Sequence, residues 1–396
     1  MAIRSSAGAF LLFLSFMAFL STLIVPSTAL GFNCSSSNEN TTCNALIDYV
    51  SPNTTTLANI SSLFSVSNFY NLLGANSYAL STSSSTIIKA NSTIKIPFPC
   101  RCTNGTGISN KIPVYTVVKN DGLDHIAREV YSGLVTYQEI AIVNNISNVN
   151  IINIGQQLWI PLRCSCDKVD GDQVVHYGHV VVKGSSVEQI AQEYDTTEST
   201  LLKLNGMSNA NELQASQVLD VPLKVCTSSV TKEAEDYPLL IPNGTYSLTA
   251  YNCIQCSCQF STSREVHCEP TSGIKPTNVS QCPSTKCGST YIGNTTSDCS
   301  TCAYGGYSKE VIFHVNSPNC SAVTPSAVTP AVTPSVNYAP ARIGFEGSSF
   351  EGLLFLRSQP TEAVRRDILD IGCECEDISS VLQWHLPNFQ LCSLLV

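Results

Sequence analysis

The sequence predicts an α+β fold in which three small modules follow one another and precede a cysteine-rich region. Three strings, IKIPFPCRC, LWIPLRCSC and LDVPLKVC, each place an apolar run and a proline before cysteine, and they end at Cys102, Cys166 and Cys226. Apolar residues with helical spacing precede each string. Because one ending recurs at regular intervals, the chain is expected to use one module three times.

Residues 1–30 have the layout of a secretory signal peptide. Arg4 precedes an apolar run over residues 7–25, and the small residues of PSTALG follow, so cleavage is expected near Ala29 to Gly31. A membrane anchor is the alternative, but the run is short for a span and polar sequence follows at once. The mature chain is therefore expected to be secreted.

Cysteines and glycosylation sequons also indicate an extracellular protein. The chain has 19 cysteines, of which sixteen lie between Cys34 and Cys320 and can pair completely, whereas Cys373, Cys375 and Cys392 leave an odd thiol. Asn-X-Ser/Thr sequons, none of them beyond residue 319, occur at Asn33, Asn40, Asn53, Asn59, Asn91, Asn104, Asn145, Asn243, Asn278, Asn294 and Asn319.

A helix is predicted early in each copy of the module, which we place at residues 34–102, 113–162 and 176–223. Each helix has an apolar stripe at positions i, i+3, i+4 and i+7. The stripes are Leu57, Ile60, Ser61 and Phe64; Leu123, Ile126, Ala127 and Val130; and Val187, Ile190, Ala191 and Tyr194. Ser186 and Gln189 have the spacing of a capping box, which marks the start of the third helix.

A strand is predicted before each of these helices, at residues 114–118 and 179–182 and, less clearly, at Tyr49 and Val50. A second short helix follows and ends at asparagine, namely Asn76, Asn144 or Asn205. The closing strand comes next. The order strand, helix, helix, strand predicts a small α+β module with an antiparallel strand pair and both helices on one face.

Such a module buries little apolar surface and would be marginally stable alone. In Cys-X-Cys on an extended chain both side chains point to the same face, and a ring between them would be strained, so each thiol is expected to find a distant partner. Six cysteines flank the first two copies: Cys34, Cys43, Cys100, Cys102, Cys164 and Cys166. Cross-pairing them would lock the copies together, although the sequence alone leaves fifteen connectivities open.

Two longer stretches resemble known sequences. The string YTVVKNDGLDHIAREVYSGLVTYQEIAIVNNISNVNIINIGQQLWIPL of the second copy resembles a LysM module. The string IPNGTYSLTAYNCIQCSC at 241–258, together with Cys34 and the Cys-X-Cys pairs, is similar to plant LysM-domain GPI-anchored proteins. The resemblance covers roughly residues 30 to 340.

This resemblance implies a βααβ fold and a receptor-like protein of innate immunity that binds N-acetylglucosamine polymers, chitin or bacterial peptidoglycan. It implies no cofactor. Since the sequence shows neither a kinase nor a membrane span, a LysM receptor kinase is the expected partner for signalling. The resemblance also implies three disulfides, which join Cys34 to Cys102, Cys43 to Cys166 and Cys100 to Cys164.

A LysM-like module would bind sugar in a shallow groove between its strand-to-helix loop and the loop before its last strand. The resemblance favours the second copy. Its candidate ligand-binding residues are Asn120, Asp121, Gly122, Leu123, Asp124, His125, Ile126, Asn148, Val149, Asn150, Ile151, Ile152, Asn153 and Ile154. Asparagine and glycine in these loops could instead be simple turn formers. Residues 184–189 and 205–211 of the third copy are the second choice, because a glycan on Asn145 could obstruct the first.

Sugar stacking on tryptophan, metal binding and thiol redox chemistry are less favoured. Trp159 could stack on sugar, but its place in a closing strand favours core packing. His176 and His179 in HYGH lack a cysteine or carboxylate at matching separation nearby in the sequence, so no metal is expected. The two Cys-X-X-Cys motifs, at residues 253–256 and 299–302, are better explained by disulfides in an exported chain.

An enzyme and a structural wall protein are the competing classes. A glycosidase needs two carboxylates across a cleft, whereas Glu188, Glu193 and Glu198 are expected on a solvated helix face. No nucleophile elbow, zinc-protease motif or P-loop occurs, and no segment remains for a catalytic domain, so we expect no enzyme. With 13% charged residues and a net charge of −9, the sequence also lacks a basic surface for nucleic acid. Neutral polar contacts should therefore recognise the ligand.

The chain from residue 226 onward divides into three predicted parts: a disulfide-bonded region at 226–320, a proline- and threonine-rich spacer at 321–341 and an atypical tail at 342–396. The spacer suits a structural wall protein or a receptor stalk equally well. A GPI signal needs an apolar terminal tail, but Arg357, Arg365 and Arg366 interrupt this one. Relatives would lie on the outer face of the plasma membrane, whereas this chain is expected to be released as a soluble extracellular protein.

Overall fold

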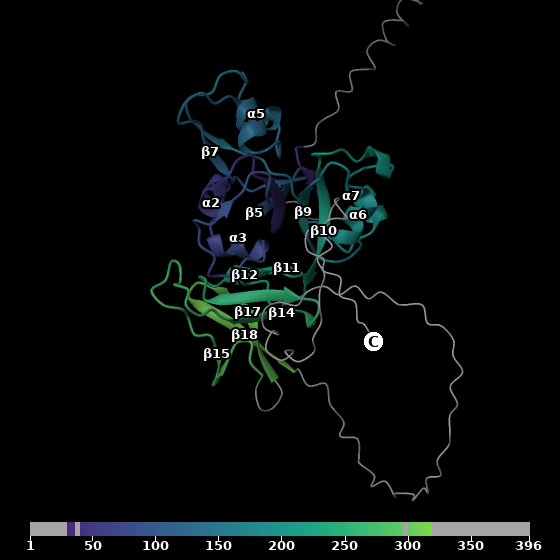
Figure 1. Ribbon diagram of the computed structural model, residues 1–396. Coiled ribbons are helices and arrows are strands. Elements are labelled where there is room, and N and C mark those ends of the chain that lie inside the picture. The colour runs from purple at the N-terminus through teal and green to yellow at the C-terminus, as the bar shows by residue number, and fades with distance from the viewer. Residues whose placement is uncertain (1–29, 36–39, 296–299, 319–396) are drawn as a thin grey trace, which may run out of the picture. The chain divides into compact units, whose positions relative to one another are not determined.

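The computed structural model describes residues 30–35, 40–295 and 300–318 (Figure 1). The predictions for residues 1–29 and for the spacer and tail beyond residue 318 concern residues outside this part. Each module has two main strands around two helices. These elements are β2 (Thr42–Val50), α2 (Leu57–Leu63), α3 (Phe69–Ala75) and β5 (Thr93–Thr103); β7 (Val114–Thr116), α4 (Leu123–His125), the π-helical η2 (Ile126–Val130), α5 (Tyr137–Val143) and β8 (Gln157–Trp159); and β9 (Val174–Val180), α6 (Val187–Glu193), α7 (Glu198–Leu204) and β10 (Val218–Cys226).

The predicted α+β fold class is confirmed, since the strand pairs β2 with β5, β7 with β8 and β9 with β10 are all antiparallel. Three strand boundaries differ from the prediction. The strand expected at Tyr49 and Val50 begins at Thr42. The strand expected over residues 179–182 runs from Val174 to Val180, and the one expected over 114–118 ends at Thr116. The prediction missed the start of β9, because buried His176 does not resemble a strand residue without its carboxylate partner.

The first and third modules share one sheet, whose strand order is β1 (Phe32–Asn33), β6 (Thr106–Ser109), β5, β2, β9, β10 and β11 (Ile241–Pro242). Strand β2 pairs in parallel with β9 at Leu46 with Tyr177 and at Ile47 with Gly178. A Cβ atom at Gly178 would lie 3.0 Å from the Ile47 side chain, so only glycine allows this close approach without adjustment. The second module keeps a separate pair, β7 with β8.

The first two modules also share one hydrophobic core. Phe64 of the first module lies edge-on to Tyr49 and to Tyr131 of the second, with ring centroids 4.9 and 5.5 Å apart. The Tyr131 hydroxyl donates to the Leu63 carbonyl oxygen at 3.1 Å. A separate core under α6 and α7 belongs to the third module and includes Leu46 of β2. Strand β2 therefore faces two cores.

The asparagine at the end of each second helix joins that helix to the closing strand. Asn144 donates from Nδ2 to the Ile140 and Trp159 carbonyl oxygens, both at 2.8 Å, and its Oδ1 accepts from the Trp159 amide at 2.9 Å. Asn76 makes the same three bonds to Leu72 and Lys95, and Asn205 to Leu201 and Asp220. These side chains satisfy a helix-end carbonyl and fix the closing strand.

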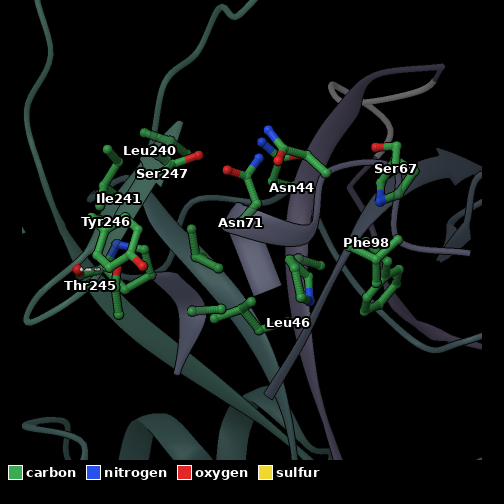
Figure 2. A pocket seen from close by; sticks show the side chains of 18 of the residues that line it. Asn44, Leu46, Ser67, Asn71, Phe98, Leu240, Ile241, Thr245, Tyr246 and Ser247 are labelled. Carbon is green, nitrogen blue, oxygen red and sulfur yellow. Dashed lines mark hydrogen bonds between the residues drawn. The ribbon is translucent and has the colours of Figure 1, made fainter. Parts of the chain in front are cut away.

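The cysteine-rich region consists of short antiparallel strands. They are β12 (Tyr246–Thr249), β13 (Ile254–Gln259), β14 (Ser263–Pro270), β15 (Lys286–Cys287), β16 (Thr290–Tyr291), β17 (Ser300–Ser308) and β18 (Val311–Pro318). Strand β12 packs on α3 of the first module, where Asn71 and Ser247 lie side by side (Figure 2). A Cβ atom at Gly74 would lie 2.0 Å from the Tyr246 carbonyl oxygen, so this contact requires glycine.

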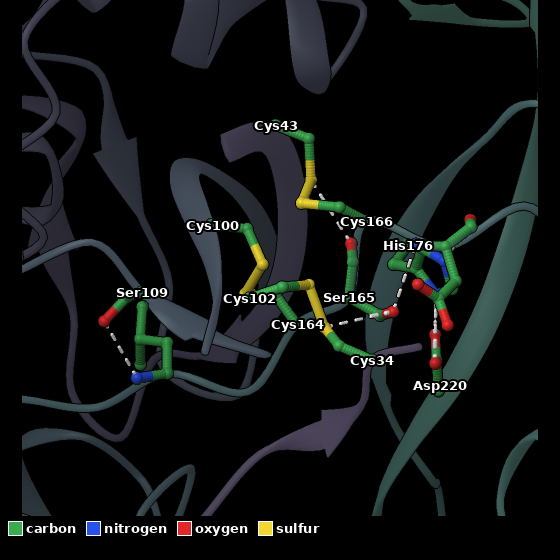
Figure 3. The surroundings of a disulfide bond; sticks show 12 residues. Cys34, Cys43, Cys100, Cys102, Ser109, Cys164, Ser165, Cys166, His176 and Asp220 are labelled. Atoms are coloured by element: carbon green, nitrogen blue, oxygen red, sulfur yellow. Dashed lines mark hydrogen bonds and ion pairs between the residues drawn. A yellow bond between two sulfur atoms is a disulfide. The ribbon is translucent and has the colours of Figure 1, made fainter. Parts of the chain in front are cut away.

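Three disulfides gather at the end of the first two modules (Figure 3). They join Cys34 to Cys102, Cys43 to Cys166 and Cys100 to Cys164, the pairs that the resemblance implied. Cys100 and Cys164 are fully buried, and their Cα atoms lie 5.9 Å apart. The described part of the cysteine-rich region contains four more, which are Cys226–Cys258, Cys253–Cys282, Cys256–Cys268 and Cys287–Cys302.

Both histidines of HYGH form buried pairs with carboxylates. His179 Nδ1 lies 2.9 Å from an Asp48 oxygen, and Asp48 also accepts from the Tyr177 hydroxyl. His176 Nδ1 lies 2.9 Å from Asp220, and its Nε2 donates to the Asp167 carbonyl oxygen at 2.9 Å. The sequence analysis found no carboxylate near these histidines, because Asp48 and Asp220 lie on strands that are distant in the sequence. Asp48 and His179 join the first module to the third.

We expect loss of the Cys100–Cys164 disulfide to destabilise the joined modules. In a Cys100→Ala/Cys164→Ala variant, the unfolding free energy should fall by about 2–5 kcal/mol, because the cross-link restricts the unfolded chain. Thermal unfolding of the secreted protein measures the change. The Cys287→Ala/Cys302→Ala variant is the control, since its disulfide lies within the cysteine-rich region. Unchanged unfolding of the first variant would contradict the proposed structural role.

Stability should also depend on the protonation of His176. Burial lowers its pKa, but the charge of Asp220 and the hydrogen bonds to Asp220 and Asp167 outweigh burial, and the pKa is raised. Protonated His176 therefore contributes its full stabilisation below about pH 6.5, the pKa of histidine in the unfolded chain. This contribution is lost as pH rises through the higher pKa of His176 in the folded protein. Denaturant unfolding from pH 5 to pH 9 should show this loss in the wild type and not in a His176→Gln variant. The same pH dependence of unfolding free energy in the wild type and the variant would refute this role of His176.

Candidate functional site

The two loops predicted to form a groove in the second module are joined at their bases. The Val117 amide donates to the Gln156 carbonyl oxygen at 2.9 Å, and the Gly155 amide donates to the Val117 carbonyl oxygen at 2.8 Å. These bonds extend the pairing of β7 with β8 beyond the strand ends. Gly155 has a φ of 81°, which glycine adopts without strain. The backbone therefore fixes the residues just before the loop at 120–126 against those just after the loop at 148–154.

Side chains of each loop fix its own shape. Asp121 Oδ2 accepts from the Val118 amide at 2.8 Å and from the Tyr115 hydroxyl at 2.9 Å. Burial, aided by this bond and by the charge of Asp121, raises the pKa of Tyr115 to about 12. In the other loop, Asn148 Oδ1 accepts from the Asn150 amide and Gln156 Oε1 from the Asn153 amide. Asparagine and aspartate in these loops thus act as turn formers, and the same turns can hold the loops in one shape for a ligand.

The structure reduces the number of predicted residues whose side chains can contact a ligand. Leu123 and Ile126 are 2% and 0% exposed and belong to the core, so their side chains cannot contact a ligand. Asp121 is occupied within its loop, and Val149 and Ile152 are half-buried against the same core. The predicted residues with exposed side chains are Asn120, Asp124, His125, Asn148, Asn150, Ile151, Asn153 and Ile154. Gly122 is the residue before α4 and can offer only backbone groups.

Aliphatic side chains are unusually exposed along these loops. Val118, Ile151 and Ile154 are 54%, 63% and 70% exposed. In the sequence, Asn150 directly precedes Ile151, and Asn153 directly precedes Ile154. Aliphatic side chains can pack against the apolar face of a sugar ring, and amide groups can bond its acetamido and hydroxyl substituents. The sequence analysis did not include Val118 in the site, because it assigned this residue to the end of the predicted strand at 114–118.

The same pairing recurs in the other two modules, with different loops. Ser51 in the first module and Val181 in the third take the place of Val117 and bond to the loop before the closing strand. In the first module, sequons lie within these loops at Asn53 and Asn91, and a third lies in the first turn of α2 at Asn59. In the third module they carry none, but residues 208–215 contain no large exposed aliphatic side chain. The second module alone combines exposed isoleucines with loops free of sequons, since Asn145 precedes its loop.

The structure offers no simple metal site in the described residues. The one cluster of suitable ligand atoms consists of Cys43, Cys100 and Cys166, all of which form disulfides. Trp159 is half-buried, and its Nε1 donates to Ser109 Oγ at 3.1 Å, so its indole is held within the protein. No helix in the described part of the chain has the length and apolar character that a membrane span requires.

Comparison with known proteins identifies the family. The LysM domain profile matches residues 115–161 and 179–222. Over 305 residues the chain is 44% identical to LysM domain-containing GPI-anchored protein 2 of Arabidopsis thaliana, a match that covers 77% of this chain and 86% of the relative. The chain belongs to the LysM domain-containing GPI-anchored proteins. The second and third βααβ units, which the profile matches, are accordingly described below as LysM modules.

Two further members of this LysM family align over most of their length. Chitin elicitor-binding protein of Oryza sativa subsp. japonica is 46% identical over 285 residues, which cover 72% of this chain and 79% of the relative. LysM domain-containing GPI-anchored protein 1 of Arabidopsis thaliana is 31% identical over 371 residues, which cover 88% of this chain and 87% of the relative. The LysM profile leaves residues 34–102 unmatched, although they have the same order of elements.

Proposed function

We propose that this LysM protein is an extracellular, non-enzymatic receptor-like protein that binds β-1,4-linked N-acetylglucosamine polymers, chitin or peptidoglycan, in innate immunity. The groove between residues 118–124 and 148–156 of the second module is the proposed site. The observation that carries this proposal is the exposure of Ile151 and Ile154 among neutral amides on a backbone-fixed loop. The rice relative named chitin elicitor-binding protein supports the choice of ligand.

Electrostatics supports a binder over a hydrolase. A glycosidase needs two carboxylates that face each other across a cleft. Near the proposed groove, Asp124 pairs with Arg128, and Glu139 is 1% exposed and bonded to Arg163 at 2.7 Å. Neither is placed for acid and base chemistry. A structural wall glycoprotein is the remaining alternative, and saturable binding of a soluble oligomer would distinguish a receptor from it.

A LysM receptor kinase is the proposed signalling partner. The third module suits a protein contact, because no sequon lies between Asn145 and Asn243 and N-glycans would therefore leave α6 and α7 accessible. The proposed location is outside the cell. The relatives are named GPI-anchored, which would place the chain on the outer face of the plasma membrane, whereas its atypical tail favours release from the cell. In either case the chain would present the same groove to wall fragments.

Binding should depend on the two exposed isoleucines. We expect an Ile151→Ser/Ile154→Ser variant to bind N-acetylglucosamine oligomers about tenfold more weakly, which corresponds to roughly 1.4 kcal/mol. A pull-down on insoluble chitin and peptidoglycan, with soluble oligomers as competitors, measures the change. Ile87→Ser is the matched control, because Ile87 is equally exposed, at 67%, in the first module. Equal retention of both variants would contradict the placement of the site, and no binding by the wild type would refute the function.

A glycan on Asn145 should weaken binding. Asn145 follows α5 and lines a shallow hollow with Ile142, Ile146 and Val149, next to the proposed groove. An Asn145→Gln variant should bind the oligomers about threefold more tightly, or roughly 0.7 kcal/mol, if the glycan restricts access. Asn243→Gln removes an exposed sequon of the cysteine-rich region as control. Unchanged affinity of Asn145→Gln, with loss of one glycan verified by mass, would show that this glycan leaves the groove open.

A further inference from the structure

The second LysM module exposes an aliphatic surface beside its second helix, α5. Ile142, Ile146 and Val149 line a shallow hollow there. Ile142 is 56% exposed, and the other two side chains are partly exposed. The main contacts of α5 are with α4, η2 and β8, which all belong to its own module. Because aliphatic groups in water are unfavourable, this hollow favours a partner with apolar groups.

The same face can be compared in all three modules, because an asparagine ends each second helix. Two positions before this asparagine, the modules have in turn Gly74, Ile142 and Lys203. One position after it, they have Ser77, Asn145 and Gly206. These two positions therefore mark equivalent places on the three modules.

In the first module, the cysteine-rich region covers this face. Strand β12 packs on α3, as Figure 1 shows. Gly74 lies against the backbone of Tyr246, and the Ser77 hydroxyl donates to the Gly244 carbonyl oxygen at 2.8 Å. Protein thus occupies the place that is a hollow in the second module.

In the third module, a charged side chain fills the equivalent place. Lys203 is exposed, and its ammonium group stays in water. Met207, which takes the place of Ile146, is 9% exposed and belongs to the core of that module. The second module is therefore the one in which the described protein leaves this face both aliphatic and exposed.

A glycan acceptor stands at this hollow on a fixed piece of backbone. Asn145 has a φ of 54°, and its amide donates to the Ile142 carbonyl oxygen at 3.2 Å. The Ile146 amide donates to the Ala141 carbonyl oxygen at 2.9 Å, which completes the two bonds of a Schellman cap. Asn145 is exposed, lines the hollow and begins the sequon Asn-Ile-Ser. A glycan would thus start from a rigid helix end beside the aliphatic side chains.

An N-glycan begins with N-acetylglucosamine, which has C–H groups on its ring faces and a methyl group on its acetamido substituent. These groups can pack on aliphatic side chains while the hydroxyl groups remain in water. We propose that the glycan on Asn145 is a structural part of the second module and that its first sugar residues pack on Ile142, Ile146 and Val149. The glycan then covers the face that β12 covers in the first module. This role does not depend on the binding of sugar polymers by the proposed groove.

Removal of the glycan from the secreted chain tests the proposal. Ser147→Ala abolishes the sequon and keeps Asn145, so the helix cap is retained, and mass spectrometry verifies the loss of one glycan. The midpoint of thermal unfolding should fall by about 2–4 °C. Ser280→Ala is the matched control, because it removes the sequon of exposed Asn278 in the cysteine-rich region. It should leave the midpoint unchanged.

A second substitution separates packing on the hollow from a general effect of glycans. Ile142→Ser keeps the sequon and removes the most exposed aliphatic side chain of the hollow. In this background, Ser147→Ala should lower the midpoint by at most about half as much, because the glycan has lost a packing partner. A loss that Ile142→Ser does not change, no loss in Ser147→Ala alone, or an unglycosylated Asn145 in the wild type would overturn the proposal.

A second copy of the chain is the other occupant that an aliphatic hollow could take. Analytical ultracentrifugation of the glycosylated wild type distinguishes the two, and we expect a monomer because the glycan covers the hollow. A dimer that Ile142→Ser dissociates would show that a second copy, and not the glycan, covers this face.

Discussion

Strand β2 is the element on which the rest of the structure depends. It pairs with β5 of its own module on one side and with β9 of the third module on the other. Because side chains alternate along a strand, Ala45 and Ile47 face the core shared with the second module, while Leu46 faces the core of the third. Cys43 begins this strand and is bonded to Cys166. One nine-residue strand thus connects three modules.

This arrangement explains why such small units are stable. Each module alone would bury too little apolar surface, so its stability comes from neighbours and from cross-links. Disulfides join the second module to the first, and sheet pairing joins the third. The buried Asp48 strengthens the sheet pairing between the first and third modules. It accepts hydrogen bonds from the Tyr177 hydroxyl and from the Val180 amide, which is next to His179. The loops that carry the proposed sugar site are then free to vary, because they contribute little to this framework.

Local patterns predicted the repeated units well. The helical stripe at Leu123 and Ile126 and the asparagine at Asn144 both mark elements that the structure contains. Long-range contacts were not predictable in the same way. The pairing of Leu46 with Tyr177 joins positions far apart in the sequence, and neither residue signals its partner. For the same reason the carboxylate partner of His176 was missed, because Asp220 is 44 positions away and only the sheet brings it near.

The candidate sugar site was predictable only as a pair of loops. Sequence spacing located residues 120–126 and 148–154, but it could not separate buried Leu123 from exposed Ile151, because both are simply aliphatic. Solvent exposure is decided by the register of the adjoining strands.

Hydrogen–deuterium exchange with and without a soluble N-acetylglucosamine octamer tests the central claim most directly. If the second module binds the sugar, amides in residues 117–124 and 148–156 should exchange more slowly in the presence of the oligomer, and the matching loops at 181–188 and 208–217 should not change. Protection of the third-module loops alone would contradict the account, as would the absence of protection anywhere at saturating oligomer.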